Sequence, residues 1–307
     1  MDGDSVALEI WIDRDSRELV EEATLLAASS FRWQHGRVRV HVHRTHVGLY
    51  GQWMATWRPR DALTAETALL LEDDLTVSPF AYRWLRAARR FYADRNDLAG
   101  FTLQSEGLIR ATTGGPLTPP PAAAGAAFLY ALMGSWGFAP RPDVWIGFQD
   151  WYASVTAGGQ RRLKPFVPGL IMSTWYEKFE REEKANTMWT MWFIFYCSQV
   201  REQLYTVYNN VHSVAAAAAP ATDGRYLCVN RREAGLHFGV SEKSTVTTLQ
   251  KVLRTWRPEF AQLSRTPPVF NYGGEPVHVT VNRSVIISPA VAVAALPVKN
   301  RAKDIES

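Results

Sequence analysis

Three adjacent carboxylates, Glu72, Asp73 and Asp74, follow the apolar run 67–71 directly. The run is typical of a buried strand, and open α/β sheets bind ligands beyond the carboxyl ends of their strands. Adjacent acids repel one another, and a divalent cation relieves that repulsion because Mg²⁺ and Mn²⁺ take oxygen ligands and share them with substrate phosphates. In the alternative interpretation, Asp73 and Asp74 begin a turn and cap the next helix. The position after a strand favours the metal site.

Several other side chains could do chemistry, and each has a structural alternative. His237, in Gly-Leu-His-Phe-Gly, could ligate a metal, although a lone His is more often structural. His41, His43 and His46 have no Cys or acid at ligand spacing, which favours an exposed strand face over a metal cluster. The glycine-flanked Trp136 could cover a sugar ring, and it fits equally well as a core residue in a tight turn.

The elements that must position these groups alternate between strand and helix patterns. Runs typical of strands lie at 6–12, 37–43, 67–71, 98–103 and 128–132. Helical patterns lie at 15–28, 78–91, 142–153 and 174–210. The first helix is expected to open on a capping box formed by Asp15 and Glu18. This alternation predicts an α/β fold with a mainly parallel central sheet flanked by helices.

The composition describes a folded protein with an unusual number of tryptophans. The chain has 307 residues, a net charge of +4, 47% hydrophobic and 21% charged residues, which excludes a disordered protein. Its basic residues are scattered, so the charge does not imply nucleic-acid binding. The longest apolar run, 188–197, is half of the roughly 20 residues that a membrane-spanning helix needs. Within this run, the helical spacing of Trp189, Trp192, Phe193 and Tyr196 predicts a core stripe.

A resemblance to a known family rests on two motifs. The pattern Glu72-Asp73-Asp74-Leu75-x-Val77-x-Pro79, followed by an aromatic helix, resembles the DxD-type motif of glycosyltransferases with the GT-A fold. It is most similar to the Glu-Asp-Asp form in the Golgi N-acetylglucosaminyltransferase I family. It is also similar to eukaryotic family-2-like glycosyltransferases with Leu-Glu-Asp-Asp and a later Ser-Trp-Gly, which stands here within 134–137. Together the matches span about 6–239, and they imply a GT-A-like, Rossmann-like sheet.

The resemblance implies a metal-dependent enzyme that moves a sugar from a nucleoside-diphosphate donor, of the UDP-sugar type, to a hydroxyl of a glycan, protein or lipid. It makes Asp74 the principal ligand of Mn²⁺ or Mg²⁺, with His237 as a second ligand or a pyrophosphate contact. Asp73 would support the metal or contact the donor ribose, and Glu72 would lie nearer the sugar. Asp13, which ends the first strand, would contact the uracil edge, or else it is a turn acid.

The resemblance also suggests which groups act during transfer. Inversion at the anomeric carbon, which we expect, requires a carboxylate within hydrogen-bond reach of the acceptor hydroxyl. The aromatic and acidic segment 174–179 makes Glu177 the candidate base, with Asp150 in reserve; Glu177 could instead be an exposed helical residue. Trp136 would belong to the sugar site.

The implied organisation has four parts. They are a nucleotide-sugar and metal-binding half (1–110), a flexible Pro/Gly/Ala loop (111–127), an acceptor-binding and catalytic half (128–245) and a C-terminal extension (246–307). Such enzymes open with a βα unit ahead of the strand ending near Asp13, and this sequence starts later. We expect either a preceding segment with an anchor in the Golgi or endoplasmic reticulum, or a reduced cytoplasmic domain. A reduced domain motivates the alternative function, a non-catalytic GT-A-like module that binds a glycan or a partner.

Overall fold

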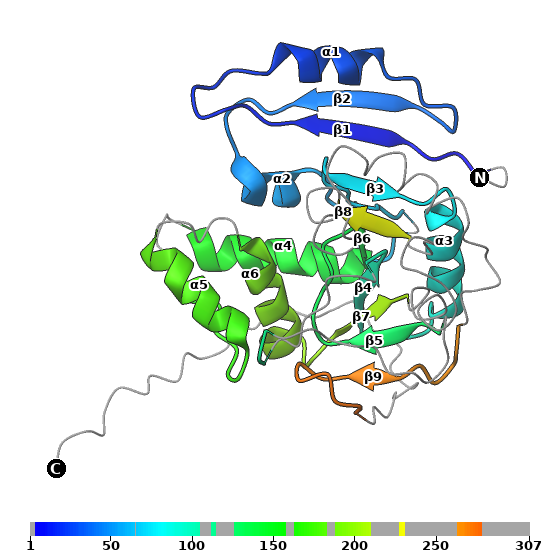
Figure 1. Ribbon diagram of the computed structural model, residues 1–307, viewed down its shortest axis with the longest axis vertical. Helices are drawn as coiled ribbons and strands as arrows, with labels where there is room; N and C mark the ends of the chain where they lie inside the picture. The colour runs from blue at the N-terminus through cyan, green and yellow to red at the C-terminus, as the bar shows by residue number, and fades with distance from the viewer. Residues whose placement is uncertain are drawn as a thin grey trace, which may run out of the picture.

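A computed structural model describes residues 4–64, 66–104, 112–114, 126–157, 163–182, 188–209, 227–230 and 263–277. The predicted α/β class is confirmed, because helices flank a sheet that mixes parallel and antiparallel pairs (Figure 1). Most of the predicted loop 111–127, together with His237, lies outside the described residues.

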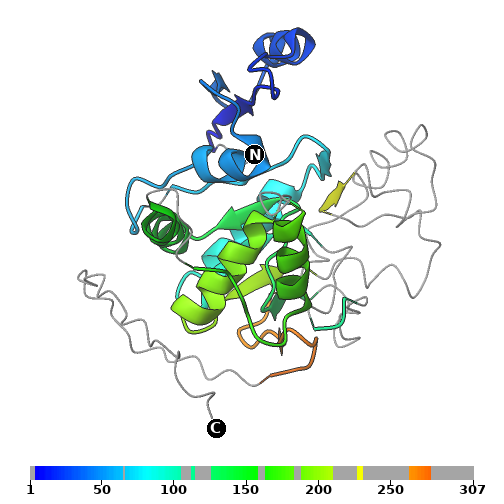
Figure 2. The same ribbon diagram turned by 90° about the vertical axis from the view of Figure 1, so that its left-hand side faces the viewer.

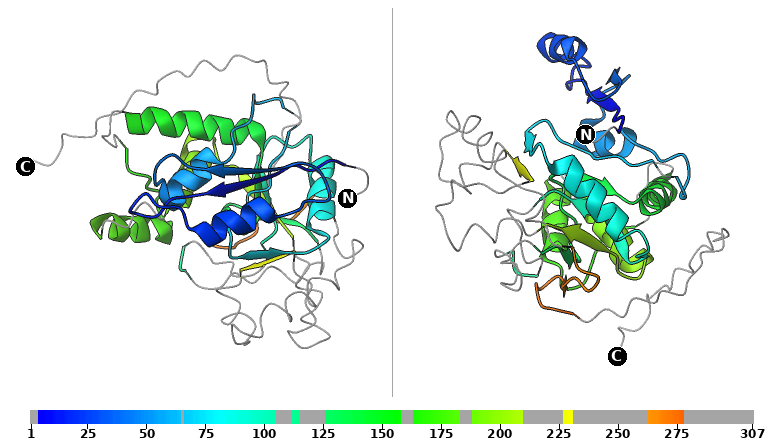
Figure 3. Two further views of the ribbon diagram at one scale, coloured as in Figure 1. Left: turned by 90° about the horizontal axis from the view of Figure 1, so that it is seen from above. Right: turned by 90° about the vertical axis from the view of Figure 1, so that its right-hand side faces the viewer.

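The chain begins with a βαβ unit that stands out from the rest of the protein, as Figure 2 and Figure 3 show. Strands β1 (Leu8–Ile12) and β2 (Val38–Val42) pair in parallel, and α1 (Glu22–Ser30) connects them. The predicted capping box is wrong. The carboxylate of Asp15 accepts hydrogen bonds from the backbone N–H groups of Arg17 and Leu19, which closes a turn. Glu18 has a φ of 63° in that turn, so the helix begins only at Glu22.

The central sheet has five strands in the order β6-β4-β7-β5-β9. Their bounds are Phe138–Pro140, Leu98–Thr102, Tyr205–Tyr208, Phe128–Tyr130 and Val269–Phe270. Two neighbouring pairs, β4 with β7 and β5 with β9, are parallel, whereas β4 with β6 and β5 with β7 are antiparallel. The expectation of a mainly parallel sheet therefore needs correction to a mixed sheet. Because β9 pairs with β5, part of the predicted C-terminal extension belongs to this sheet.

The strand predicted at 67–71 is reduced to one bridge. The backbones of Leu70 and Phe138 exchange two hydrogen bonds, of 2.8 and 3.2 Å. This bridge adds the segment around Leu70 to the sheet beside β6. The acid triplet then leads into β3 (Leu75–Val77), which pairs with β8 (Cys228–Asn230) in an antiparallel ladder.

Helices cover both faces of the sheet. The helix α3 (Ala81–Phe91), which the sequence predicts, lies on one face, and its Trp84 and Ala88 are buried as the spacing requires. The other face is covered by α4 (Pro142–Thr156), α5 (Ile171–Arg181) and α6 (Trp189–Phe195), as Figure 1 shows. A π-helical turn (Tyr196–Val200) ends α6. A short helix that the sequence did not suggest, α2 (Gly48–Ala55), connects the βαβ unit to the body.

Aromatic side chains fill the core between the sheet and α4, α5 and α6. The predicted stripe of Trp189, Trp192, Phe193 and Tyr196 is confirmed, since each of these residues is buried. The stripe packs against residues of α4, with Phe148 and Phe193 at a centroid distance of 5.0 Å. Packing in this cluster accounts for half of the 12 tryptophans, namely Trp53, Trp57, Trp145, Trp151, Trp189 and Trp192.

Candidate functional site

The acid triplet lies at the carboxyl edge of the central sheet. Leu70 pairs antiparallel with Phe138, and β6 pairs antiparallel with β4, so the segment around Leu70 runs in the direction of β4. The strands β4 and β7 are parallel, and Gln104 and Asn209 follow their last residues. Leu70, Phe138 and Thr102 form a row across the strands. The segment around Leu70 is two strands away from β4, with β6 between them. Since neighbouring strands lie about 4.8 Å apart, the chain leaves the sheet towards the triplet about 10 Å from the end of β4.

The loop 131–137 brings the second motif to the same edge. Thr102 Oγ1 donates a hydrogen bond to the carbonyl of Trp136 at 3.3 Å, and Tyr208 Oη donates to the carbonyl of Leu132 at 2.9 Å. A Cβ atom on Gly134 would lie 2.7 Å from Gln104 Oε1 and 2.9 Å from Thr102 Oγ1, so a larger residue here would have to displace these side chains. The two motifs that carry the family resemblance thus meet at one edge of the sheet.

Trp136 itself points into the protein. Its side chain is 8% exposed and packs in the core beneath α3. The structure therefore favours the core alternative over the sugar platform, because little of the ring is accessible to a ligand.

The carboxylates of the triplet are held by side chains from distant parts of the chain. Trp53 Nε1 donates to Glu72 Oε1 at 2.9 Å, and Asn230 Nδ2 donates to Asp74 Oδ2 at 3.2 Å. Asp73 is exposed. Burial raises the pKa of the nearby Cys228 thiol to about 12, and the charges of Asp74 and Glu72 add to that rise. Both carboxylates therefore lie close enough to the buried thiol of Cys228, at the start of β8, to raise its pKa.

No group of three His, Cys, Asp or Glu side chains among the described residues could hold a metal ion. A cation at Asp74 would consequently need ligands from outside this set. Mg²⁺ commonly binds in this manner, through one or two carboxylates completed by substrate phosphates and waters. The oxygen chemistry of the triplet fits that mode of binding.

Two buried amides at the edge carried no clear signal in the sequence. Asn209 Nδ2 donates to the carbonyls of Leu103 and Gln104, at 2.9 and 3.3 Å, and so ties the end of β7 to the end of β4. Its Oδ1 is buried and accepts no hydrogen bond from the described part of the chain. Gln104 directly follows the strand predicted at 98–103, but β7, which Asn209 follows, lies in a region predicted to be helical.

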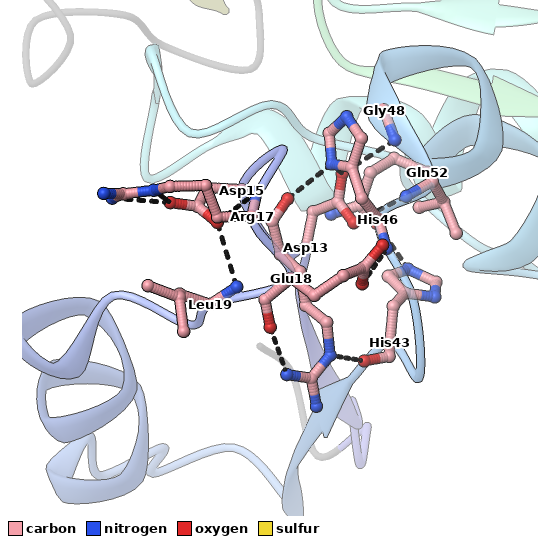
Figure 4. A network of polar contacts seen from close by, with 11 residues as sticks. Asp13, Asp15, Arg17, Glu18, Leu19, His43, His46, Gly48 and Gln52 are labelled. Carbon is pink, nitrogen blue, oxygen red and sulfur yellow. Dashed lines mark hydrogen bonds and ion pairs between the residues drawn. The ribbon is translucent and has the colours of Figure 1, made fainter.

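Asp13 has a different role from the predicted uracil contact (Figure 4). Its two carboxylate oxygens accept the backbone N–H groups of Val47 and Gly48, at 2.9 and 2.7 Å, and Oδ2 also lies 3.1 Å from His46 Nδ1. These bonds cap the N-terminus of α2. Burial raises the pKa of Asp13, but hydrogen bonds from Val47, Arg14 and Gly48 outweigh it, so the pKa lies below its usual value.

The histidines near Asp13 were only partly predicted. His41 is half-buried, and its Nε2 lies 2.5 Å from Glu9 Oε2 on the neighbouring strand, an acid partner that sequence spacing did not reveal. His43 is buried, with its Nε2 2.8 Å from Gln52 Oε1, because α2 packs over it (Figure 4). The prediction of an exposed strand face is therefore wrong for His43.

The two candidate bases lie in different surroundings. Glu177 is exposed on α5, and Figure 1 shows α5 far from β3 and β8, so the structure does not bring Glu177 to the triplet. Asp150 is exposed on α4 and pairs with Arg58, which follows α2, at 2.6 Å. Of the two, Asp150 lies near the helix that contacts Glu72.

Comparison of the sequence with protein-family models found no match, and comparison with curated proteins found none either. None of the helices that the described residues form is long and apolar enough to cross a lipid bilayer.

Proposed function

We propose that the protein is a metal-dependent glycosyltransferase that moves a sugar from a nucleoside-diphosphate donor, of the UDP-sugar type, to an acceptor hydroxyl. The observation that carries this proposal is the meeting of Glu72–Asp74 with the loop 131–137 at the carboxyl edge of the sheet. Ligands of open α/β sheets bind at such edges. The GT-A fold itself is part of the proposal.

Asp74 and Asp73 would hold Mn²⁺ or Mg²⁺ together with oxygens of the donor diphosphate. When bound, the cation supplies positive charge that stabilises the leaving diphosphate. Asn230 would orient Asp74 for this role, because its amide donates a hydrogen bond to one carboxylate oxygen at 3.2 Å. Glu72, fixed by Trp53, would lie on the side of the donor sugar.

Buried polar groups support the edge beside the triplet. Thr102 and Asn209 donate hydrogen bonds to backbone carbonyls, so they hold the loop 131–137 and the ends of the strands in place. Of the two predicted bases, we retain Asp150, because the neighbouring Gln149 donates a hydrogen bond to the carbonyl of Met54 on α2, the helix that contacts Glu72.

Replacing Asp74 with Ala tests the proposal. We expect the wild-type protein to melt at a higher temperature with UDP and Mn²⁺ together than with either alone. A ligand at 100 times its Kd stabilises a protein by about 2.7 kcal/mol. In Asp74→Ala the increase and the transfer of sugar from a panel of UDP-sugars should both be lost. The control is Asp94→Ala, an exposed acid after α3 that pairs with Arg265 at 3.5 Å, which should behave as wild type.

The outcomes separate the two candidate functions. Retention of sugar transfer by Asp74→Ala would contradict the metal-site assignment. If the wild-type protein shows no Mn²⁺-dependent binding of UDP at all, the non-catalytic module that binds a glycan or a partner becomes the better interpretation.

A further inference from the structure

Trp53 lies between the aromatic core and the acid triplet. Its side chain is 4% exposed, and its ring stacks on Trp189 with a centroid distance of 4.3 Å and an interplanar angle of 28°. Trp189 in turn meets Trp145 edge to face at 6.0 Å. The indole N–H that reaches Glu72 at 2.9 Å is therefore part of a ring that the core holds in place.

The helix that carries Trp53 is itself fixed at its beginning. Asp13 caps the backbone N–H groups of Val47 and Gly48, and His43 contacts Gln52, the residue before Trp53. Both contacts come from the carboxyl ends of β1 and β2. The position of the Trp53 indole thus depends on the βαβ unit as well as on the aromatic core.

Glu72 needs such a partner because two further acids follow it in the chain. Repulsion between neighbouring carboxylates favours rotamers that carry Glu72 away from Asp73 and Asp74. A Lys or Arg partner would oppose this movement but would also neutralise charge that a cation requires. An indole N–H donates a hydrogen bond and adds no charge of its own, so it can hold Glu72 without neutralising it.

We propose that Trp53 is a positioning residue for Glu72, and that α2 links the βαβ unit to the acid triplet. Its effect on sugar transfer rests on the proposed function, whereas the bond between the two side chains can be tested without it.

The test compares two Trp→Phe substitutions in the same aromatic cluster. Trp53→Phe keeps a ring against Trp189 and removes the donor to Glu72. Trp57→Phe is the matched control, because Trp57 packs against the same cluster while its Nε1 has no hydrogen-bond partner among the described residues. We expect Trp53→Phe to lower kcat/KM for the donor about tenfold or more, as loss of a hydrogen bond to a charged group does. Trp57→Phe should change it less than about twofold.

A double-mutant cycle separates positioning from a general loss of packing. If Trp53 acts through Glu72, Trp53→Phe should have little further effect in a Glu72→Ala background. Equal effects of Trp53→Phe in both backgrounds would overturn the proposal. So would a Trp53→Phe enzyme with wild-type kcat/KM.

An NMR measurement keeps the proposal testable if Trp53→Phe fails to fold or the protein transfers no sugar. Glu72→Ala should move the indole N–H resonance of Trp53. Asp73→Ala should change this resonance no more than it changes the indole resonances of the other tryptophans. An unchanged Trp53 resonance in Glu72→Ala would overturn the positioning role. Failure of the wild-type protein to bind UDP with Mn²⁺ would instead count against the proposed function alone.

Discussion

The cap that Asp13 forms on α2 leads to a prediction that separates a structural role from ligand binding. Asp13→Ala removes the acceptor of two backbone N–H groups, those of Val47 and Gly48. Loss of a helix cap costs about 0.5–2 kcal/mol, and two short bonds to one carboxylate place this site in the upper half of that range. The exposed His46 contact adds little. We therefore expect a loss of about 1–2 kcal/mol in the free energy of unfolding at pH 7.

The pH dependence of this loss follows from the sign of the pKa shift. The pKa of Asp13 is lower in the folded protein than its ordinary value of 3.8. The folded state is therefore favoured by ionised Asp13, fully above the unfolded pKa and less as the pH falls through the folded pKa. The difference between wild type and Asp13→Ala should be constant from about pH 5 to 7 and shrink below about pH 4.

Urea denaturation, followed by tryptophan fluorescence at pH 7 and at about pH 3, measures this difference. Asp13→Asn is the control, because Asn keeps one acceptor oxygen, cannot accept the second backbone N–H with its amide nitrogen, and does not ionise. It should lose only part of the stability at pH 7 and lose the pH dependence. An Asp13→Ala protein as stable as wild type at pH 7, or a difference that is the same at both pH values, would refute the cap. Loss of UDP affinity without loss of stability would instead support the uracil contact.

Two further predictions test the interior. Burial raises the pKa of the Cys197 thiol and raises that of Cys228 to about 12. At pH 8 both thiols should therefore be unreactive towards a disulfide reagent in the folded protein and reactive in urea. Rapid labelling of the folded protein would contradict their burial. Gly134→Ala would place a Cβ atom 2.9 Å from both Thr102 Oγ1 and Tyr208 Oη and 2.7 Å from Gln104 Oε1, so it should cost about 1–3 kcal/mol in a denaturation experiment. Wild-type stability would contradict the close packing of these side chains around Gly134.

Local patterns were sufficient to predict several elements. The apolar runs of β1, β2, β4 and β5 are visible in the sequence, and so is the buried spacing of α3. Each of these predictions depends on residues within one element. The α/β class follows from their order along the chain.

The missed elements depend on contacts that a local pattern does not contain. The strand β7 follows a strongly aromatic helix directly, and the chain reverses there through Glu202 and Gln203, with φ of 56° and 65°. Neither residue is a glycine, so the turn had no conventional signal. Each antiparallel pair, β4–β6 and β5–β7, contains one of the two strands that were not predicted, β6 and β7.

In the candidate site, too, the sequence gives the type of each residue but not the groups that it contacts. Asp13 and Glu72 were both predicted to bind the donor because the resemblance to GT-A glycosyltransferases implies that role for each of them. Asp13, however, is bonded to backbone N–H groups 34 and 35 residues away, whereas Glu72 is bonded to a tryptophan 19 residues away. Backbone donors at a helix N-terminus take up both oxygens of Asp13 and give its negative charge a structural use. The donors that the described residues offer to Glu72 and Asp74 are neutral side chains, which orient the carboxylates and add no positive charge. This difference in partners, which residue type alone does not reveal, separates a carboxylate with a structural role from the carboxylates that the proposed function places at the donor.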